Sequence, residues 1–136
     1  PLLEQNPQQL TIANRTISKA QSIVKQYPQY PINCCAFDGV VNQTFDVIIN
    51  ATSAGLNGQA LPISDKVIQS NVICYDMTYG KSLTPFLQIA KRRNAAKLID
   101  GLGMLVGQAA VSFNIWRKIK PDTHHVLAML RSEMSA

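Results

Sequence analysis

The chain has 136 residues, which is the size of one domain or of part of a larger one. Its composition, with 46% hydrophobic and 15% charged residues, is that of a globular protein and excludes a disordered tail or a coiled coil. The 13 basic and 8 acidic residues leave a net charge of +5. This charge allows an anionic partner but does not distinguish a nucleic acid, a membrane or a phosphorylated cofactor.

Three cysteines indicate a reducing compartment, and we expect the cytoplasm. Cys34 and Cys35 are adjacent and Cys74 stands apart, a spacing that fits neither a disulfide framework nor a CxxC metal site. The most apolar stretch, residues 98–116, is interrupted by polar residues and falls short of the roughly 18–20 apolar residues of a membrane span. No secretory signal opens the sequence, so we expect no membrane partner.

Short apolar runs alternate with helical patterns along the chain. Five runs have the composition of strands: Leu10–Asn14, Ile32–Phe37, Phe45–Asn50, Val72–Asp76 and Ala96–Ile99. Strands that are apolar on both faces belong to a parallel sheet covered by helices, and strand–helix alternation is typical of the same class. We therefore predict an α/β fold with a parallel sheet and helices on both faces.

Helix boundaries are marked by capping residues. Apolar residues at helical spacing predict a helix over Thr16–Tyr27. Thr84 followed by a proline predicts the start of a helix over Pro85–Arg93, with Asn94 as its stop. Asp122 caps the predicted last helix, residues 122–132.

The helix that begins near Gly101 is apolar on most sides. Leu102, Leu105, Val106, Ala109, Phe113 and Trp116 form one stripe, and Met104, Val111 and Ile115 form a second. Such a helix is buried or lies between domains. Gln108 falls on the second stripe, where its amide needs a partner from the protein or from a ligand.

The end of the first strand carries cations where a dinucleotide-binding domain specific for NAD usually carries a carboxylate. Arg15, Thr16 and Lys19 stand there at the start of a helix. The two cations, the hydroxyl and the helix N-terminus suit the dianionic 2′-phosphate of a dinucleotide, which a carboxylate would repel. A solvated turn with a helix cap is the alternative interpretation.

Three later strand ends are also possible ligand contacts, because ligands bind at the carboxyl ends of parallel strands. Small residues at Ala51, Thr52 and Ser53 allow close backbone approach. Met77 and Tyr79 offer a surface for a flat ring and a hydroxyl. Gly101 opens a GxG that lacks the third glycine of the dinucleotide fingerprint. An ordinary turn or core filling would explain each of these taken alone.

Other polar clusters need no ligand. His124 and His125 have no carboxylate or thiol at ligand spacing, so we expect surface residues and no metal site. The basic runs Lys91–Arg93 and Arg117–Lys120 lie near helix C-termini, where they oppose the helix dipole. They form no stripe with interleaved aromatics, so we do not expect nucleic acid, although a nucleic-acid-binding module remains an alternative.

Taken together, these segments resemble the C-terminal half of the shikimate dehydrogenase family. The matching motifs occur in order at Asn14–Lys19 (NRT-x-x-K), Phe45–Leu56 (FDVIINATSAGL), Cys74–Tyr79 (CYDMTY), Thr84–Leu87 (TPFL) and Asp100–Ala110 (DGLGMLVGQAA). The resemblance covers nearly the whole chain and implies a Rossmann-like fold. It also implies NADP as the cofactor and the reversible reduction of 3-dehydroshikimate to shikimate with NADPH.

The resemblance also implies the role of each residue. Asn14, Arg15, Thr16 and Lys19 would receive the 2′-phosphate, and Lys19 stands where members often have Arg, so it keeps the charge but not the guanidinium fork. Ala51, Thr52 and Ser53 would lie beside the cofactor's ribose and diphosphate. Met77 and Gly101 would flank the nicotinamide. Tyr79 and Gln108 would reach the shikimate or 3-dehydroshikimate.

Two family features are missing from this sequence. The resemblance implies an N-terminal substrate domain with a catalytic Lys–Asp pair, and a first strand with a Gly-rich diphosphate loop. We therefore expect residues 1–136 to form an incomplete NADP-binding domain without catalytic residues, inactive alone, whose helix 122–132 packs toward the missing domain. The strands at Leu10 and Phe45 would lack a partner between them. A quinate/shikimate paralogue that uses NAD and a non-catalytic NADP-binding fragment are the alternatives.

Overall fold

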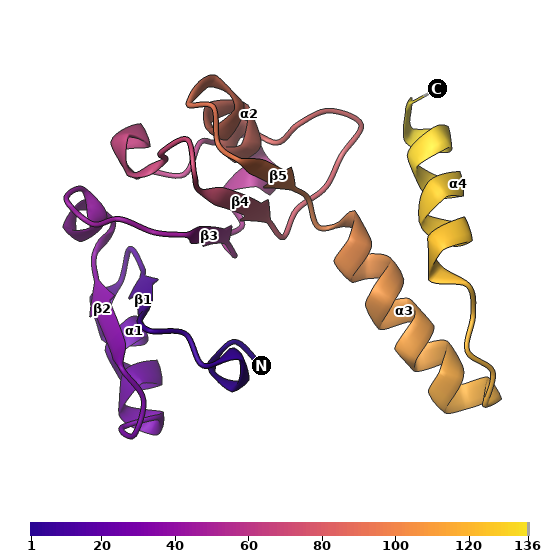
Figure 1. The fold of residues 1–136 in the computed structure, drawn as a ribbon, viewed down its shortest axis with the longest axis horizontal. Coiled ribbons are helices and arrows are strands. Elements are labelled where there is room, and N and C mark those ends of the chain that lie inside the picture. The colour runs from indigo at the N-terminus through magenta and orange to yellow at the C-terminus, as the bar shows by residue number, and fades with distance from the viewer. Residues whose placement is uncertain (136) are drawn as a thin grey trace. The chain divides into compact units, whose positions relative to one another are not determined.

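A computed structural model describes residues 1–135, although the side chains of residues 56, 57 and 135 lie outside the description. The motif residue Leu56 is among them. The elements are β1 (Leu10–Ala13), α1 (Ile17–Gln26), β2 (Ile32–Cys35), β3 (Val47–Asn50), β4 (Ile73–Asp76), α2 (Pro85–Arg92), β5 (Lys97–Ile99), α3 (Leu102–Arg117) and α4 (Thr123–Ser135) (Figure 1). All the strand pairs are parallel, so the predicted α/β class is confirmed.

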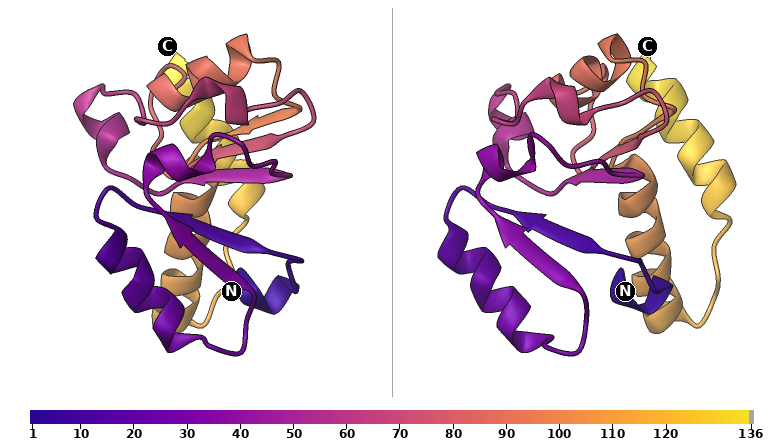
Figure 2. Two further views of the ribbon diagram at one scale, coloured as in Figure 1. Left: turned by 90° about the vertical axis from the view of Figure 1, so that its left-hand side faces the viewer. Right: turned by 60° about the vertical axis from the view of Figure 1, so that its left-hand side comes forward.

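The chain divides into two units. The first, residues 1–44 and 62–67, contains β1 and β2 paired from Leu10 and Ile32 onward, with α1 packed on them (Figure 2). Ala20 of α1 and Ile32 of β2 are buried in its core, together with Val40. The turn with the two cations Arg15 and Lys19 lies in this unit, between β1 and the first turn of α1.

The second unit, residues 45–61 and 68–136, contains the sheet β3–β4–β5. Successive side chains of a strand point to opposite faces. On one face Val72 and Cys74 are buried, and α2 packs against β4 and β5 with its own buried Phe86 and Leu87. Thr84 caps this helix by accepting a hydrogen bond from Leu87 N (3.3 Å), as predicted.

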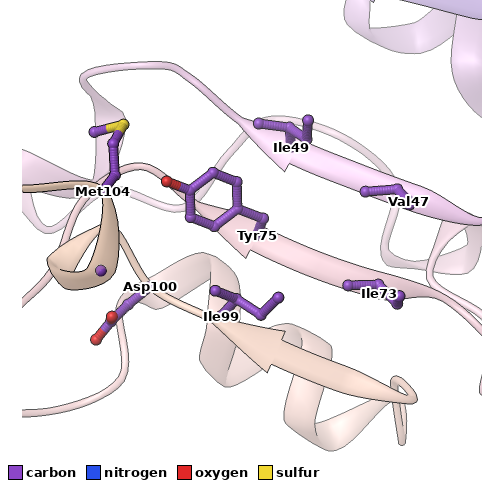
Figure 3. Close-up of a pocket in the computed structure, with 8 residues that line it drawn as sticks. Val47, Ile49, Ile73, Tyr75, Ile99, Asp100 and Met104 are labelled. Atoms are coloured by element: carbon purple, nitrogen blue, oxygen red, sulfur yellow. The ribbon is translucent and has the colours of Figure 1, made fainter. Parts of the chain in front are cut away.

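The other face of this sheet lies open. An apolar hollow of about 370 Å³ extends over it and is lined by Val47, Ile49, Ile73, Tyr75, Ile99, Asp100, Gly103 and Met104 (Figure 3). The side chains that rise from the three strands there are apolar except for the tyrosine hydroxyl. Within this unit, the described helix that packs on the sheet is α2, and it covers the opposite face.

Each sheet has two edge strands among residues 1–135, and β1 and β3 are both edge strands. β1 pairs with β2 alone, and β3 pairs with β4 alone. This agrees with the prediction that the strand expected between them is missing. Open edges expose a row of backbone donors and acceptors, which a further strand can satisfy.

Two strand boundaries differ from the prediction by two residues, and the others differ by one residue at most. β2 ends at Cys35, and Phe37–Val40 form a 3₁₀ turn in which the chain folds back so closely that a Cβ at Gly39 would lie 2.7 Å from the Cβ of Cys35. β3 begins at Val47, two residues later than Phe45.

The long helix α3 is not buried within this chain. Leu102 and Val106 near its start are buried, whereas Val111, Ile115 and Trp116 are exposed, the last at 78%. α4 runs along α3 and covers one side of it (Figure 1). No helix of residues 1–135 has the length and apolar character needed to cross a membrane.

One ion pair joins the far end of α4 to the start of α3. The Arg131 guanidinium donates to both carboxylate oxygens of Asp100, with Nη1 2.6 Å from Oδ2. These hydrogen bonds lower the pKa of Asp100 below its ordinary value. The pair therefore ties α4 to the residue at which β5 ends.

Candidate functional site

The carboxyl ends of four strands carry the same turn. In each, an Asn or Asp side-chain oxygen accepts a hydrogen bond from the backbone N–H two residues later. The bonds are Thr16 N to Asn14 (2.9 Å), Thr52 N to Asn50 (3.1 Å), Thr78 N to Asp76 (3.0 Å) and Leu102 N to Asp100 (3.2 Å). The middle residues of these turns are Arg15, Ala51, Met77 and Gly101, and all four were predicted as cofactor contacts.

The turn after β1 presents two cations at a helix N-terminus. Arg15 and Lys19 are exposed, and Thr16 directly precedes α1. Thr16 makes no side-chain hydrogen bond to the first turn of the helix, so its hydroxyl does not act as a cap. The alternative interpretation of this segment, a solvated turn with a helix cap, therefore lacks a cap by the Thr16 side chain. Side-chain cations and helix N–H groups together form an anion-binding surface.

The ends of β3, β4 and β5 contact one another. Met77 N donates to the carbonyl oxygen of Asn50 (3.0 Å), and Gly101 N donates to that of Thr78 (3.0 Å). A Cβ at Gly55 would lie 3.0 Å from the Oγ1 of Thr78. The structure therefore brings the predicted contacts of the third, fourth and fifth strands into one cluster.

Within this cluster Met77 and Gly101 are immediate neighbours. A Cβ added to Gly101 would lie 1.9 Å from the carbonyl oxygen of Met77, so only glycine permits this approach. The side chains of Met77 and Tyr79 are 39% and 45% exposed. A hollow with both polar and apolar walls includes Tyr79 and is lined by Gly55, Thr78, Tyr79, Gly80, Ser82, Leu83, Thr84, Pro85 and Gln88. Exposed apolar and hydroxyl groups thus border a surface open to a ligand.

Two predicted residues lie at the margin of the cluster. Ser53 follows the Asn50 turn and is exposed. Gln108 is exposed on α3, seven residues after Gly101, which places it about 10 Å along the helix axis. That the amide of Gln108 binds a protein group or a ligand stays a prediction.

The three cysteines and the two histidines lie outside this cluster of strand-end turns or beneath it. Cys34, Cys35 and Cys74 are free, and burial raises the pKa of Cys74 to about 11, so this thiol is protonated at neutral pH. The backbone N–H groups of His124 and His125 donate to Asp122, which caps α4 as predicted. Among residues 1–135 no group of three His, Cys, Asp or Glu side chains could hold a metal ion.

Two family models match the chain. The model described as "Shikimate / quinate 5-dehydrogenase" matches residues 1–61, and the one described as "Shikimate 5'-dehydrogenase C-terminal domain" matches residues 101–131. A shikimate dehydrogenase (NADP(+)) of Colwellia psychrerythraea is 50% identical over 134 residues, which cover 98% of this chain and 49% of the relative. The chain belongs to the shikimate dehydrogenase family. It spans about half the length of the curated relatives it matches, and aligns to their C-terminal half.

Solved structures of two similar proteins agree with this fold. An Ael1 enzyme from Pseudomonas putida has a TM-score of 0.88 and 38% identity over 96% of this chain and 48% of its own. A shikimate dehydrogenase crystallised with NADP+ has a TM-score of 0.80 and 29% identity over 93% of this chain and 47% of its own. The Rossmann-like fold predicted from the motifs is therefore confirmed.

Three of the four residues that build the strand-end turns had no role predicted from the sequence. Asn50, Asp76 and Asp100 accept the hydrogen bonds that shape the turns, yet only Asn14 was named as a site residue. The signal was available as a repeated pattern, Asn or Asp followed two residues later by Thr, at residues 14–16, 50–52 and 76–78. Such residues favour side-chain-to-backbone bonds in turns.

Proposed function

We propose that this chain is the NADP-binding part of a shikimate dehydrogenase, which reversibly reduces 3-dehydroshikimate to shikimate with NADPH. Membership in the family and the curated relatives named for NADP(+) support this proposal. The observation that carries the choice of cofactor is the exposed pair Arg15 and Lys19 around the N-terminus of α1, in a turn closed by Asn14. An Asp or Glu at this place would repel a 2′-phosphate, whereas these cations attract it.

The first unit binds the adenosine 2′-phosphate in this proposal. Arg15 and Lys19 supply charge, and the free hydroxyl of Thr16 and the side chain of Asn14 supply hydrogen bonds. Lys19 acts as a point charge because an ammonium lacks the planar fork of a guanidinium. Arg15 is therefore the residue on which bidentate phosphate recognition depends.

The second unit binds the rest of the cofactor and part of the substrate. Ala51, Thr52 and Ser53 lie beside the ribose and diphosphate, where small side chains allow close approach. Met77 packs against the nicotinamide beside Gly101. The hydroxyl of Tyr79 and the amide of Gln108 contact the substrate.

The cofactor supplies hydride transfer, and this chain supplies orientation and exclusion of water. It offers no acid–base group to the reaction, so the proton is handled by the Lys–Asp pair of the N-terminal domain that the family resemblance implies. We propose that helix 122–132 packs toward that domain. The open apolar sheet face and the exposed side of α3 support a covering polypeptide, because contiguous exposed apolar surface marks interfaces. Free thiols support a location in the cytoplasm.

Titration of the chain with NADPH and NADH, followed by cofactor fluorescence, tests the proposed cofactor. We expect NADPH to bind at least about tenfold more tightly than NADH, and Arg15→Ala to remove most of the difference, since one charge-assisted bond contributes about 1.5–3 kcal/mol. Lys25→Ala is the matched control, because Lys25 is a cation of the last turn of the same helix. Equal affinities would favour the NAD-using quinate/shikimate paralogue instead.

Addition of shikimate and NADP+ to the isolated chain tests the catalytic part of the proposal. We expect no turnover, because the proposed proton-transfer pair lies in the other half of the relatives. Turnover by this chain alone would contradict that assignment. Turnover after addition of the N-terminal half of a relative would support it.

A further inference from the structure

Asp76, which the sequence analysis left without a role, is fully buried at the end of β4 and uses both carboxylate oxygens. Oδ1 accepts from Thr78 N (3.0 Å) and Thr78 Oγ1 (2.8 Å), and Oδ2 accepts from Thr84 Oγ1 (2.6 Å). The loop between these two threonines, residues 79–83, begins with Tyr79, and Met77 directly precedes Thr78. One carboxylate therefore holds this loop at both ends.

The neighbouring strand shows what the second oxygen adds. Asn50 is the register partner of Asp76 on β3 and is also buried. Its Oδ1 accepts from Thr52 N and Thr52 Oγ1, in the same way that Asp76 accepts from Thr78. An amide is thus sufficient to build the turn itself. The carboxylate at position 76 differs by offering a second acceptor, which Thr84 uses.

An amide at position 76 would lose that link. The Thr84 hydroxyl already accepts from Leu87 N, and its proton points to Oδ2 of Asp76. An asparagine would place an N–H₂ group there, which can donate to Thr84 Oγ1 but cannot accept its proton. A buried donor without an acceptor is costly, so the loop would shift to satisfy it.

Thr78 transmits any such shift to the proposed nicotinamide site. Its carbonyl oxygen accepts from Gly101 N, and its side chain lies against Gly55. Met77 is the residue between Asp76 and Thr78, so the hydrogen bonds from Thr78 to the Asp76 carboxylate also fix the position of Met77. A displaced Thr78 would therefore move Met77 and Gly101 together.

We propose that Asp76 is a positioning residue, whose carboxylate joins Thr78 to Thr84 and so holds Met77 and Gly101 where the nicotinamide half of the cofactor binds. This inference rests on the proposed function. It predicts that loss of the link affects the nicotinamide half of NADPH and leaves recognition of the 2′-phosphate unchanged, because Arg15 and Lys19 lie in the other unit.

The test measures binding of NADPH and of 2′,5′-ADP, which lacks the nicotinamide, to the full chain by calorimetry below the melting temperature of each variant. We expect Asp76→Asn and Thr84→Val to weaken NADPH about tenfold, the effect of losing one hydrogen bond to a charged group, without changing the affinity for 2′,5′-ADP. Thr84→Ser keeps the hydroxyl and should bind NADPH like the unchanged chain.

Each result separates the two proposals. If the unchanged chain binds both ligands but Asp76→Asn binds NADPH within twofold of it, the positioning role is wrong. The role is also wrong if Asp76→Asn weakens both ligands equally, since that is the signature of a general structural effect. If the unchanged chain binds neither ligand, the proposed cofactor function fails, and the inference that rests on it fails as well.

Discussion

Replacement of Gly101 by alanine tests how tightly the ends of β4 and β5 fit together. A Cβ at this position would lie 1.9 Å from the carbonyl oxygen of Met77 and 2.6 Å from its carbonyl carbon. The backbone angles of Gly101, φ −75° and ψ −3°, are open to any residue. The cost of Gly101→Ala is therefore purely steric.

The magnitude follows from which atoms must move. Overpacking of a filled site costs about 1–3 kcal/mol, and here the obstructing atoms belong to the backbone of Met77 rather than to a flexible side chain. We expect the upper part of that range, about 3 kcal/mol. Alanine reduces the entropy of the unfolded chain relative to glycine, which offsets about 0.4–1 kcal/mol. The net loss in the free energy of unfolding is then about 2 kcal/mol.

Gly103→Ala is the matched control two residues further along. Gly103 is part of helix α3, and apart from its chain neighbours and the nearby backbone of that helix no atom lies within 4 Å of a Cβ placed there. Alanine in a helix is favoured over glycine by about 0.8–1 kcal/mol, so this variant should be more stable than the unchanged chain.

Urea unfolding followed by circular dichroism measures both variants against the unchanged chain. We expect the free energy of unfolding to fall for Gly101→Ala, because of the steric cost, and to rise for Gly103→Ala, because of the helix preference. The two variants should then differ by about 3 kcal/mol. A Gly101→Ala chain at least as stable as Gly103→Ala would refute the close contact between Met77 and Gly101, and with it the assembled cluster of strand ends.

Three further outcomes are expected. Arg131→Gln should destabilise the chain by about 1 kcal/mol near neutral pH, since Arg131 is half exposed and solvent screens the pair. The pKa of Asp100 is lowered in the folded chain, so the stabilisation by this pair is present above pH about 4 and is lost as the pH falls through the folded pKa. If Arg131→Gln destabilises the chain as much in acid as at neutral pH, this reasoning is wrong. Alkylation should modify Cys34 and Cys35 before the buried Cys74, whose pKa of about 11 leaves little thiolate, and mass spectrometry of the labelled peptides would reveal the opposite order.

Local signals in the sequence predicted element type and several boundaries. Thr84 caps α2, Asn94 adopts a left-handed conformation just beyond the end of that helix, and Asp122 caps α4. Each of these residues acts on atoms within a few positions of itself. The boundary at Phe37 was missed because it depends on the approach of Gly39 to Cys35, which no periodicity encodes.

The site was predicted residue by residue, but its assembly was not. Family motifs named Met77 and Gly101, whereas their contact depends on how β4 and β5 align in register. The acceptors Asn50 and Asp76 were missed because a polar residue at a strand end has many explanations in sequence. Only the hydrogen bonds to Thr52 and Thr78 distinguish a turn former from a ligand contact.

The strand-end turns and the exposed apolar surfaces of this chain therefore differ in whether they need a partner outside the chain. The strand-end turns draw both donor and acceptor from residues two positions apart, so their shape requires nothing beyond the chain. Neighbouring residues cannot bury the apolar sheet face with Val47 and Ile49, or the exposed end of α3 at Trp116. Burial of these side chains needs a second surface. A chain of half its relatives' length can thus carry preformed strand-end turns while one apolar face of its sheet stays exposed.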